Sequence, residues 1–348
     1  MDSFIFNIDD LTVNVNLLFA FNSDSGAFSD FNPDQAFHSN LDPAIRSLPQ
    51  SRFQLRPPAS SLDSVARPVF NSDTTATHGS DFYKAESRIV GGEETDINEF
   101  PAMAGVVDVT IYQIKCGGII IASGYVLTAA HCLSNRKVNE TAVVVGEHDV
   151  NTGDSPVTQV LKVKKFILHS QYNSIPARLW SLPSDTWAGT RCERDNYDYD
   201  VGLVRTLTDI VFSDRVGPIC LPFKFYNRSF TGDKVTALGW GTLFPGGPTS
   251  NVLRKVTLDV ISQESCQQKM SNVTPRQMCT HTQGKDACQD DSGGPLLYTD
   301  PSSGWMFSVG IISYGRFCAS DEPGINTRVT SILDWIVAMT PDVTYCKK

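Results

Sequence analysis

From residue 89 onward, short apolar runs alternate with segments rich in Gly, Pro, Asn and Asp. Many short apolar runs separated by turn residues are typical of the strands of a β-sandwich or β-barrel. Near the end of the chain, residues 331–337 have instead the apolar spacing of a helix. The sequence therefore predicts an all-β domain with a C-terminal α-helix. The expected strands are 118–122, 125–128, 142–145, 160–166, 201–204, 234–238 and 252–261.

Residues 1–88 differ in composition from the rest of the chain. They contain no cysteine, are rich in Ser, Asp, Asn and Pro, and show little periodicity beyond a short strand or helix at 11–21. Such a segment cannot bury enough apolar surface to order itself. We expect residues 1–88 to be a poorly ordered pro-segment or an artefact of the gene model, and residues 89–348 to be the folded domain. The alternative for residues 1–88 is a specific binding module.

Composition and charge narrow the class of protein. A hydrophobic fraction of 41% is enough for a packed core, and no apolar run is long enough to span a membrane. The net charge of -9 argues against nucleic acid as a partner. Nine cysteines and three glycosylation sequons, at Asn139, Asn227 and Asn272, favour an oxidising, secretory route.

The first residues of the chain do not match that route. Residues 1–10 lack a basic segment, and Asn and Asp interrupt their apolar residues, so they do not form a convincing signal peptide. Either export uses an unusual leader or the first exon of the gene model is wrong. We prefer the second explanation, because a disulfide framework has no purpose in the cytosol. The expected location is therefore extracellular.

Separate motifs supply the parts of a nucleophilic site. Ser292 lies in a glycine-rich turn, in the segment QDDSGGP at residues 289–295. Serine is a weak nucleophile unless a base takes its proton. His131, in the segment LTAAHC, is the candidate base, because an imidazole exchanges protons near neutral pH. Asp200, which directly precedes an apolar run, is a candidate acid to orient that imidazole.

Together with the segment RIVGG at residues 88–92, these motifs resemble those of the chymotrypsin-like (trypsin family) serine proteases, in particular secreted arthropod-type enzymes. The resemblance covers about residues 88–340. It implies two six-stranded antiparallel β-barrels with the active site between them and a C-terminal helix. It also implies a serine endopeptidase that forms an acyl-enzyme, with His131, Asp200 and Ser292 as catalytic residues.

Asp198 competes with Asp200 for the role of the orienting acid. We prefer Asp200, because the apolar strand follows it directly, as in the family pattern.

The resemblance further implies a substrate pocket. Asp286 lies six residues before Ser292, where trypsin-like members carry an acid at the base of the primary specificity pocket. Gly315 and Gly324 match the walls of that pocket, and Ser313 lies beside them. A buried carboxylate there favours a substrate Arg or Lys. The expected substrates are therefore proteins or peptides cleaved after a basic residue.

One position departs from the family pattern. The backbone N–H groups of Ser292 and of the residue two positions earlier should form the oxyanion hole, but Asp290 replaces the usual glycine. Asp adopts glycine-type backbone conformations at a cost, and its carboxylate could repel the developing oxyanion. However, Asp is among the side chains that tolerate positive φ best. We prefer an active enzyme. The alternative is a weakly active or inactive homologue that binds and regulates partners in a proteolytic cascade.

The segment at residues 88–92 looks like a zymogen cleavage site. The resemblance implies that another trypsin-like protease cleaves after Arg88. The new Ile89 ammonium would then pair with Asp291 and order the pocket, which is a proteolytic switch. Protein protease inhibitors are further expected partners.

The resemblance pairs six cysteines: Cys116 with Cys132, Cys266 with Cys279 and Cys288 with Cys318. Cys192, Cys220 and Cys346 remain, and an odd number leaves at least one thiol free or intermolecular. In many relatives a cysteine like Cys220 tethers the pro-segment, but residues 1–115 offer it no partner.

Two loops leave alternatives open. Residues 147–149 resemble the calcium loop of trypsin relatives, yet only Glu147 and Asp154 match as acids, and calcium needs several oxygen ligands. Calcium binding is therefore an open alternative. We expect no required cofactor and assign no metal ligand. Residues 174–196 make the interval between His131 and Asp200 longer than the family pattern. They are either an insertion that narrows access to the cleft or a retained intron.

Overall fold

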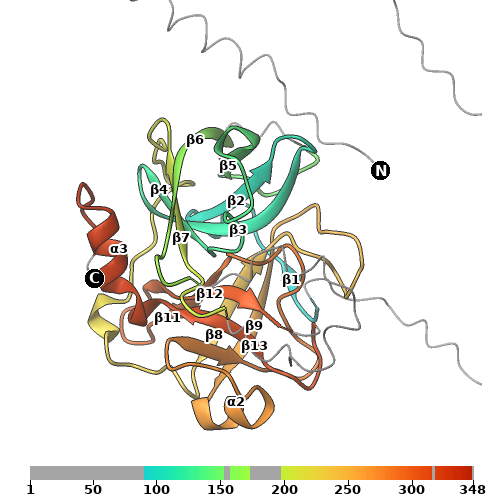
Figure 1. Ribbon diagram of the computed structural model, residues 1–348. Helices are drawn as coiled ribbons and strands as arrows, with labels where there is room; N and C mark the ends of the chain where they lie inside the picture. The colour runs from blue at the N-terminus through green and yellow to red at the C-terminus, as the bar shows by residue number, and fades with distance from the viewer. Residues whose placement is uncertain (1–89, 153–156, 173–196, 316–317, 347–348) are drawn as a thin grey trace, which may run out of the picture. The chain divides into compact units, whose positions relative to one another are not determined.

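The computed structural model describes residues 90–152, 157–172, 197–315 and 318–346 (Figure 1). The predicted pro-segment at 1–88 and the long loop at 174–196 lie outside these residues. The described residues form two closed antiparallel β-barrels of six strands each, which confirms the expected fold class.

The first barrel, cyan to green in Figure 1, has the strand order β2-β3-β4-β7-β6-β5 and is closed by pairing of β2 with β5. Thr128 at the end of β4 lies opposite Gly202 at the start of β7. Because this pair is antiparallel, the residues that follow β4 and those that precede β7 emerge at the same edge. The strands are β2 Met103–Asp108, β3 Gln113–Ala122, β4 Tyr125–Thr128, β5 Thr141–Val145, β6 Gln159–Leu168 and β7 Gly202–Thr206.

The second barrel has the strand order β9-β10-β13-β12-β11-β8 and is closed by pairing of β8 with β9. The short strand β1, Glu93–Glu94, adds to β9 outside the closed barrel. The strands are β8 Lys234–Gly239, β9 Arg254–Ile261, β10 Gln277–Thr280, β11 Pro295–Thr299, β12 Met306–Tyr314 and β13 Gly324–Arg328.

All seven predicted strands are present with slightly different ends, but the apolar pattern did not predict β1, β2 or β10 to β13. Polar residues that are nonetheless buried interrupt the pattern in the last of these strands. In β13, the side-chain amide of Asn326 donates to the carbonyl of Met278 at 3.1 Å, and Thr327 is also buried. A buried polar group is tolerated when it is hydrogen-bonded. A search for apolar runs therefore misses such strands.

The predicted C-terminal helix is α3, Leu333–Met339, and one 3₁₀ turn precedes it. Leu333 and Ile336 of α3 pack into an apolar core that contains residues of both barrels. The second α-helix, α2, was not predicted. The Ser262 hydroxyl caps α2 by accepting the backbone N–H of Ser265 at 3.1 Å. The remaining helical segments are α2 Gln263–Lys269, η3 Val138–Glu140, η6 Phe223–Phe225 and η7 Val329–Ser331.

None of the helices in the described residues is both long and apolar enough to cross a bilayer.

Four disulfides stabilise the described chain. Three are the expected pairs, Cys116–Cys132, Cys266–Cys279 and Cys288–Cys318. The fourth joins Cys220 to Cys346, so it ties the C-terminal tail to the segment between the barrels. Cys192 lies outside the described residues.

We expect the double substitution of Cys220 and Cys346 by Ser to lower the free energy of unfolding by about 2–4 kcal/mol. The reason is that this disulfide links residues 126 positions apart and so restricts the unfolded chain. Urea denaturation measures the change, with the m-value fitted for each protein, because a less restricted unfolded chain exposes more surface. An unaltered free energy of unfolding would show that this disulfide contributes nothing to stability.

Candidate active site

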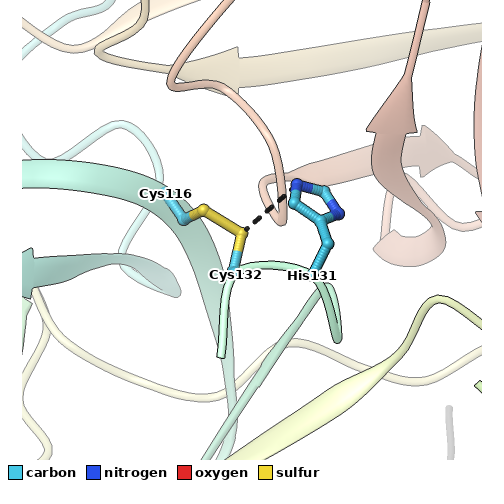
Figure 2. A group of neighbouring side chains, drawn as sticks. All are labelled: Cys116, His131 and Cys132. Carbon is cyan, nitrogen blue, oxygen red and sulfur yellow. Dashed lines mark hydrogen bonds between the residues drawn. A yellow bond between two sulfur atoms is a disulfide. The ribbon is translucent and has the colours of Figure 1, made fainter. Parts of the chain in front are cut away.

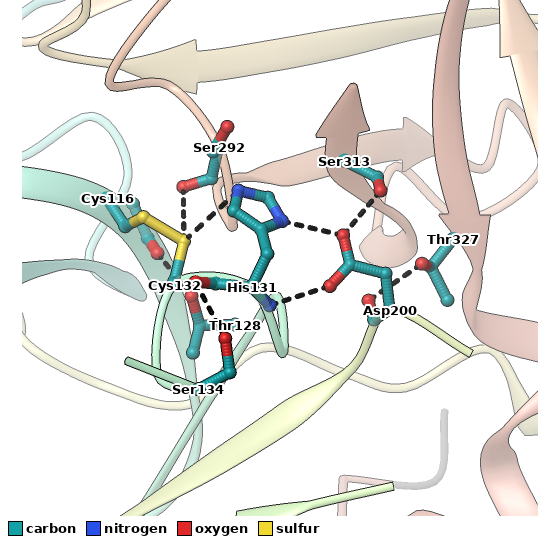
Figure 3. A network of polar contacts seen from close by, with 10 residues as sticks. Cys116, Thr128, His131, Cys132, Ser134, Asp200, Ser292, Ser313 and Thr327 are labelled. Carbon is teal, nitrogen blue, oxygen red and sulfur yellow. Dashed lines mark hydrogen bonds and ion pairs between the residues drawn. A yellow bond between two sulfur atoms is a disulfide. The ribbon is translucent and has the colours of Figure 1, made fainter. Parts of the chain in front are cut away.

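His131 and Asp200 meet at the barrel edge where β4 ends and β7 begins (Figure 3). The Nδ1 atom of His131 donates to Oδ2 of Asp200 at 2.7 Å, and the backbone N–H of His131 donates to Oδ1 at 2.9 Å. Asp200 has no exposed surface. A carboxylate held on Nδ1 fixes the ring and leaves Nε2 free to accept a proton. This is the geometry of a general base and its orienting acid.

The second barrel also holds Asp200. The Ser313 hydroxyl at the end of β12 donates to Oδ2 of Asp200, and the Thr327 hydroxyl on β13 donates to the Asp200 carbonyl at 2.8 Å. Sequence analysis assigned Ser313 to the substrate pocket. It does line the pocket, but its hydroxyl bonds the acid. Asp200 is therefore fixed from both barrels.

The competing Asp198 has different partners. Its carboxylate forms an ion pair with Arg276 and accepts the hydroxyl of Thr274 at 3.0 Å. The Arg276 guanidinium also lies over the ring of Tyr199, 4.6 Å from its centroid. Asp198 thus anchors the segment before Asp200 to the second barrel. Of the two acids, it is Asp200 that accepts the hydrogen bond from His131.

Ser292 lies in the turn before β11, above the Nε2 edge of the His131 ring in Figure 3. Its carbonyl accepts the backbone N–H of Gly117 on β3 at 2.8 Å, which ties the turn to the first barrel. Within the described residues, no hydrogen bond joins the Ser292 hydroxyl to His131. Because such bonds are often loose before substrate binds, rotation about the Cα–Cβ bond of Ser292 is the step that would form it.

Figure 2 shows the disulfide Cys116–Cys132 beside His131, with Nε2 at 3.7 Å from the sulfur of Cys132. Among the described residues, these three side chains form the one cluster of metal-ligand types. The thiolate is the form of cysteine that binds metals, and both cysteines are in a disulfide, so the cluster is not a metal site. The disulfide lies on the Nε2 side of the His131 ring.

The backbone around Ser292 fits an oxyanion hole. In the part of the chain that the structure describes, the N–H groups of Asp290 and Ser292 have no hydrogen-bond partner, whereas those of Asp291, Gly293 and Gly294 each donate to a carbonyl. Asp290 has φ +69°, in the left-handed region that glycine enters freely. Asp290 therefore adopts the glycine-type conformation and leaves its N–H available.

A cavity of about 220 Å³ opens next to Ser292. Asp286 lines it and is buried, and its Oδ2 accepts the backbone N–H of Ala319 at 3.1 Å. Burial raises the pKa of Asp286 to about 6, against the effect of the N–H groups of Ala319 and Ala287. Gly315 and Gly324 line the walls. A Cβ on Gly324 would come within 3.2 Å of the Asp286 carboxylate, so only a residue without a side chain leaves this space open.

Asp291 is a second buried carboxylate. Its Oδ1 accepts the N–H of Gly241 and its Oδ2 that of Cys288, both at 2.8 Å. It has no exposed surface, and burial raises its pKa to about 7. Within the described residues no Lys, Arg or His forms an ion pair with it. Val90 lies nearby in the fold, since its carbonyl accepts the N–H of Asp286 at 3.1 Å. Arg88 and Ile89 lie outside the described residues.

Glu147, in the loop at residues 147–149, is buried. One oxygen of its buried carboxylate accepts the N–H of His148 at 3.0 Å, and the other accepts the hydroxyl of Thr158 at 3.1 Å. Asp154 lies outside the described residues. Both oxygens of Glu147 therefore accept hydrogen bonds from the protein, and calcium binding at this loop stays an open alternative.

Sequence analysis missed two groups at the site. The Tyr197 ring lies edge-on to His131, with 6.0 Å between centroids, and 5.2 Å from the Tyr314 ring. Lys115 forms an ion pair with Asp290 across the barrels. In the sequence, only their neighbours could have pointed to these residues. Tyr314 follows Ser313, which was assigned to the pocket, and Lys115 precedes Cys116, which was assigned to a disulfide.

Comparison with known proteins shows the family to which this chain belongs. The trypsin family model matches residues 89–336. "Venom serine protease 34" of Apis mellifera is 42% identical over 76% of this chain and 61% of its own length, so the match spans less than two thirds of that relative. "Venom serine protease" of Polistes dominula is 40% identical over 75% of this chain and 88% of its own. "Clotting factor G beta subunit" of Tachypleus tridentatus is 32% identical over 73% and 80%. This chain belongs to the trypsin family of serine-type endopeptidases.

Proposed function

We propose that this chain is a zymogen whose activated form hydrolyses peptide bonds after Arg or Lys. The observation that carries the specificity is the buried Asp286 carboxylate in a cavity lined by Ser292. A basic substrate side chain entering that cavity would give the carboxylate a charge-assisted partner. Gly315 and Gly324 leave room for a long side chain.

In the proposed mechanism, the Ser292 hydroxyl attacks the scissile carbonyl while Nε2 of His131 takes its proton. Asp200 stabilises the imidazolium that forms. The N–H groups of Asp290 and Ser292 stabilise the negative oxygen of the tetrahedral intermediate. Collapse of the intermediate leaves an acyl-enzyme, and the departing amine takes the proton from His131. Water then repeats the sequence, releases the acid product and restores the Ser292 hydroxyl.

Activation would occur by cleavage after Arg88. The supporting observation is that Asp291 is fully buried and has no cationic partner among the described residues. Ionising such a carboxylate is unfavourable until a positive charge joins it. The new ammonium of Ile89 would provide that charge, and Val90 already lies within hydrogen-bonding distance of the neighbouring Asp286 backbone.

We expect the oxidatively refolded chain to hydrolyse Arg and Lys chromogenic peptides far faster after cleavage at Arg88 than before it. The physical reason is that the ion pair between Ile89 and Asp291 orders the pocket and the oxyanion hole. Rates on Arg, Lys and Phe peptides, before and after treatment with an activating protease, measure the effect.

Two variants make that experiment decisive. Arg88→Gln should resist cleavage and stay at the uncleaved rate, whereas Ser292→Ala should be cleaved normally and show no turnover. Complete cleavage of the parent chain with a rate equal to that of Ser292→Ala would refute the proposed function.

The proposed setting is extracellular. Four disulfides require an oxidising compartment, and the sequon residues Asn139, Asn227 and Asn272 are all exposed. Relatives are named as venom serine proteases and as a clotting factor subunit. The proposed partners are protein substrates, an activating trypsin-like protease and protein protease inhibitors.

The alternative of an inactive homologue has no specific support. The hydrogen bond between His131 and Asp200 and the positive φ of Asp290 support the proposed active enzyme.

A further inference from the structure

The side chain of Asp290 forms an ion pair with the first barrel. The Lys115 ammonium on β3 lies 3.6 Å from Oδ2 of Asp290, and the two side chains are only 27% and 25% exposed. Asp290 lies two residues before Ser292, so the ion pair adjoins the turn that carries the nucleophile.

A second cation acts on the same carboxylate. Burial raises the pKa of Asp290, and the positive charges of Lys115 and Arg136 oppose that rise. Arg136 is itself fixed, because its Nε donates to the Cys132 carbonyl at 2.9 Å and its Nη1 pairs with Asp108 at 3.1 Å. Lys115 is thus the direct ion-pair partner of Asp290, and Arg136 contributes at longer range.

A free carboxylate at this position would oppose catalysis. The N–H of Asp290 must face the developing oxyanion, and a negative side chain on the same residue would repel that oxygen in a partly desolvated site. An ammonium that holds the carboxylate toward the first barrel both moves the negative charge aside and offsets it.

We propose that Lys115 is a positioning residue that makes Asp290 compatible with an oxyanion hole, by holding its carboxylate against the first barrel. This inference rests on the proposed function. It assigns to this chain a paired substitution: an acid where the family has glycine, and a cation that compensates for it.

The test is a double-mutant cycle of the parent chain, Lys115→Met, Asp290→Gly and the double variant. All four are cleaved after Arg88 and titrated with a phosphonate serine reagent, so that rates refer to reactive sites. The substrate is an Arg p-nitroanilide, because it has no residues beyond the leaving group that Lys115 could bind. We expect Lys115→Met to lower kcat roughly tenfold with little change in KM. This loss is smaller than the roughly 10²- to 10³-fold decrease in kcat that follows removal of an oxyanion-hole donor.

In the Asp290→Gly background, the same substitution should change kcat by less than about twofold, since no carboxylate remains to be held. Lys115→Arg should restore most of the lost rate. Lys137→Met, which removes a 72% exposed lysine paired with Glu140, is the matched charge control and should behave as the parent. An equal loss in both backgrounds, or no loss in either, would overturn the inference. Failure of all four proteins to react with the phosphonate would instead reject the proposed function.

Discussion

An Asp200→Asn variant, activated after Arg88, is expected to lose about 10⁴-fold in kcat while its fold is unchanged. The carboxylate accepts the N–H on Nδ1 of His131 at 2.7 Å, and this bond places the ring proton away from Ser292. An amide can offer its NH₂ group to the ring instead. That favours the tautomer with the proton on Nε2, which cannot accept the proton of serine. Steady-state rates on an Arg peptide measure the loss.

Asp198→Asn is the matched control, because it makes the same chemical change two positions away. Asp198 pairs with Arg276 and Thr274, so its loss should weaken a loop contact and reduce kcat far less than Asp200→Asn. Equal losses in the two variants would mean that the segment as a whole, and not the bond to His131, sets the rate.

Asp286→Ser is expected to lower kcat/KM for Arg and Lys peptides by about 10²- to 10⁴-fold, which corresponds to 3–5 kcal/mol for removing one partner of a buried charge pair. The substrate cation would then enter the cavity without a carboxylate to receive it. Activity on a Phe peptide should not fall, because a neutral ring loses no ionic partner. A parallel loss on Phe would indicate a collapsed pocket rather than lost recognition.

The raised pKa of Asp286 adds a pH dependence to this prediction. As pH falls through about 6, the free carboxyl becomes protonated and neutral, so its attraction for a basic side chain is lost. The ratio of kcat/KM for Arg over Phe peptides should therefore decline below pH 6, and any effect of pH on the catalytic steps that both substrates share cancels in that ratio. Asp286→Ser should make the ratio independent of pH.

Sequence analysis located those parts of the site that lie in contiguous motifs. Each catalytic candidate lies beside a strand end: His131, Asp200 and Ser292. A short motif next to an apolar strand can be recognised in the sequence, so these positions could be predicted. The three expected disulfides also followed from the resemblance. The architecture of two barrels could be expected because the motifs and their order are specific.

Contacts between distant segments could not be predicted. The pairing of Cys220 with Cys346, and of Lys115 with Asp290, depends on which residues the closed barrels bring together. The double bonding of Asp200 by Ser313 and Thr327 depends on the register of β12 and β13, strands that buried polar residues partly obscured. The conformation of Asp290 is likewise a tertiary outcome, because propensity alone permits either sign of φ.

Because both barrels hold Asp200, the order in which activity and secondary structure are lost on heating can be predicted. His131 and Asp200 come from the first barrel, while Ser313 and Thr327 come from the second. A small slip of one barrel against the other would misalign the imidazole before either barrel loses a strand. Activity therefore depends directly on the alignment of the two barrels. During heating, loss of turnover should run ahead of loss of the far-UV circular dichroism signal.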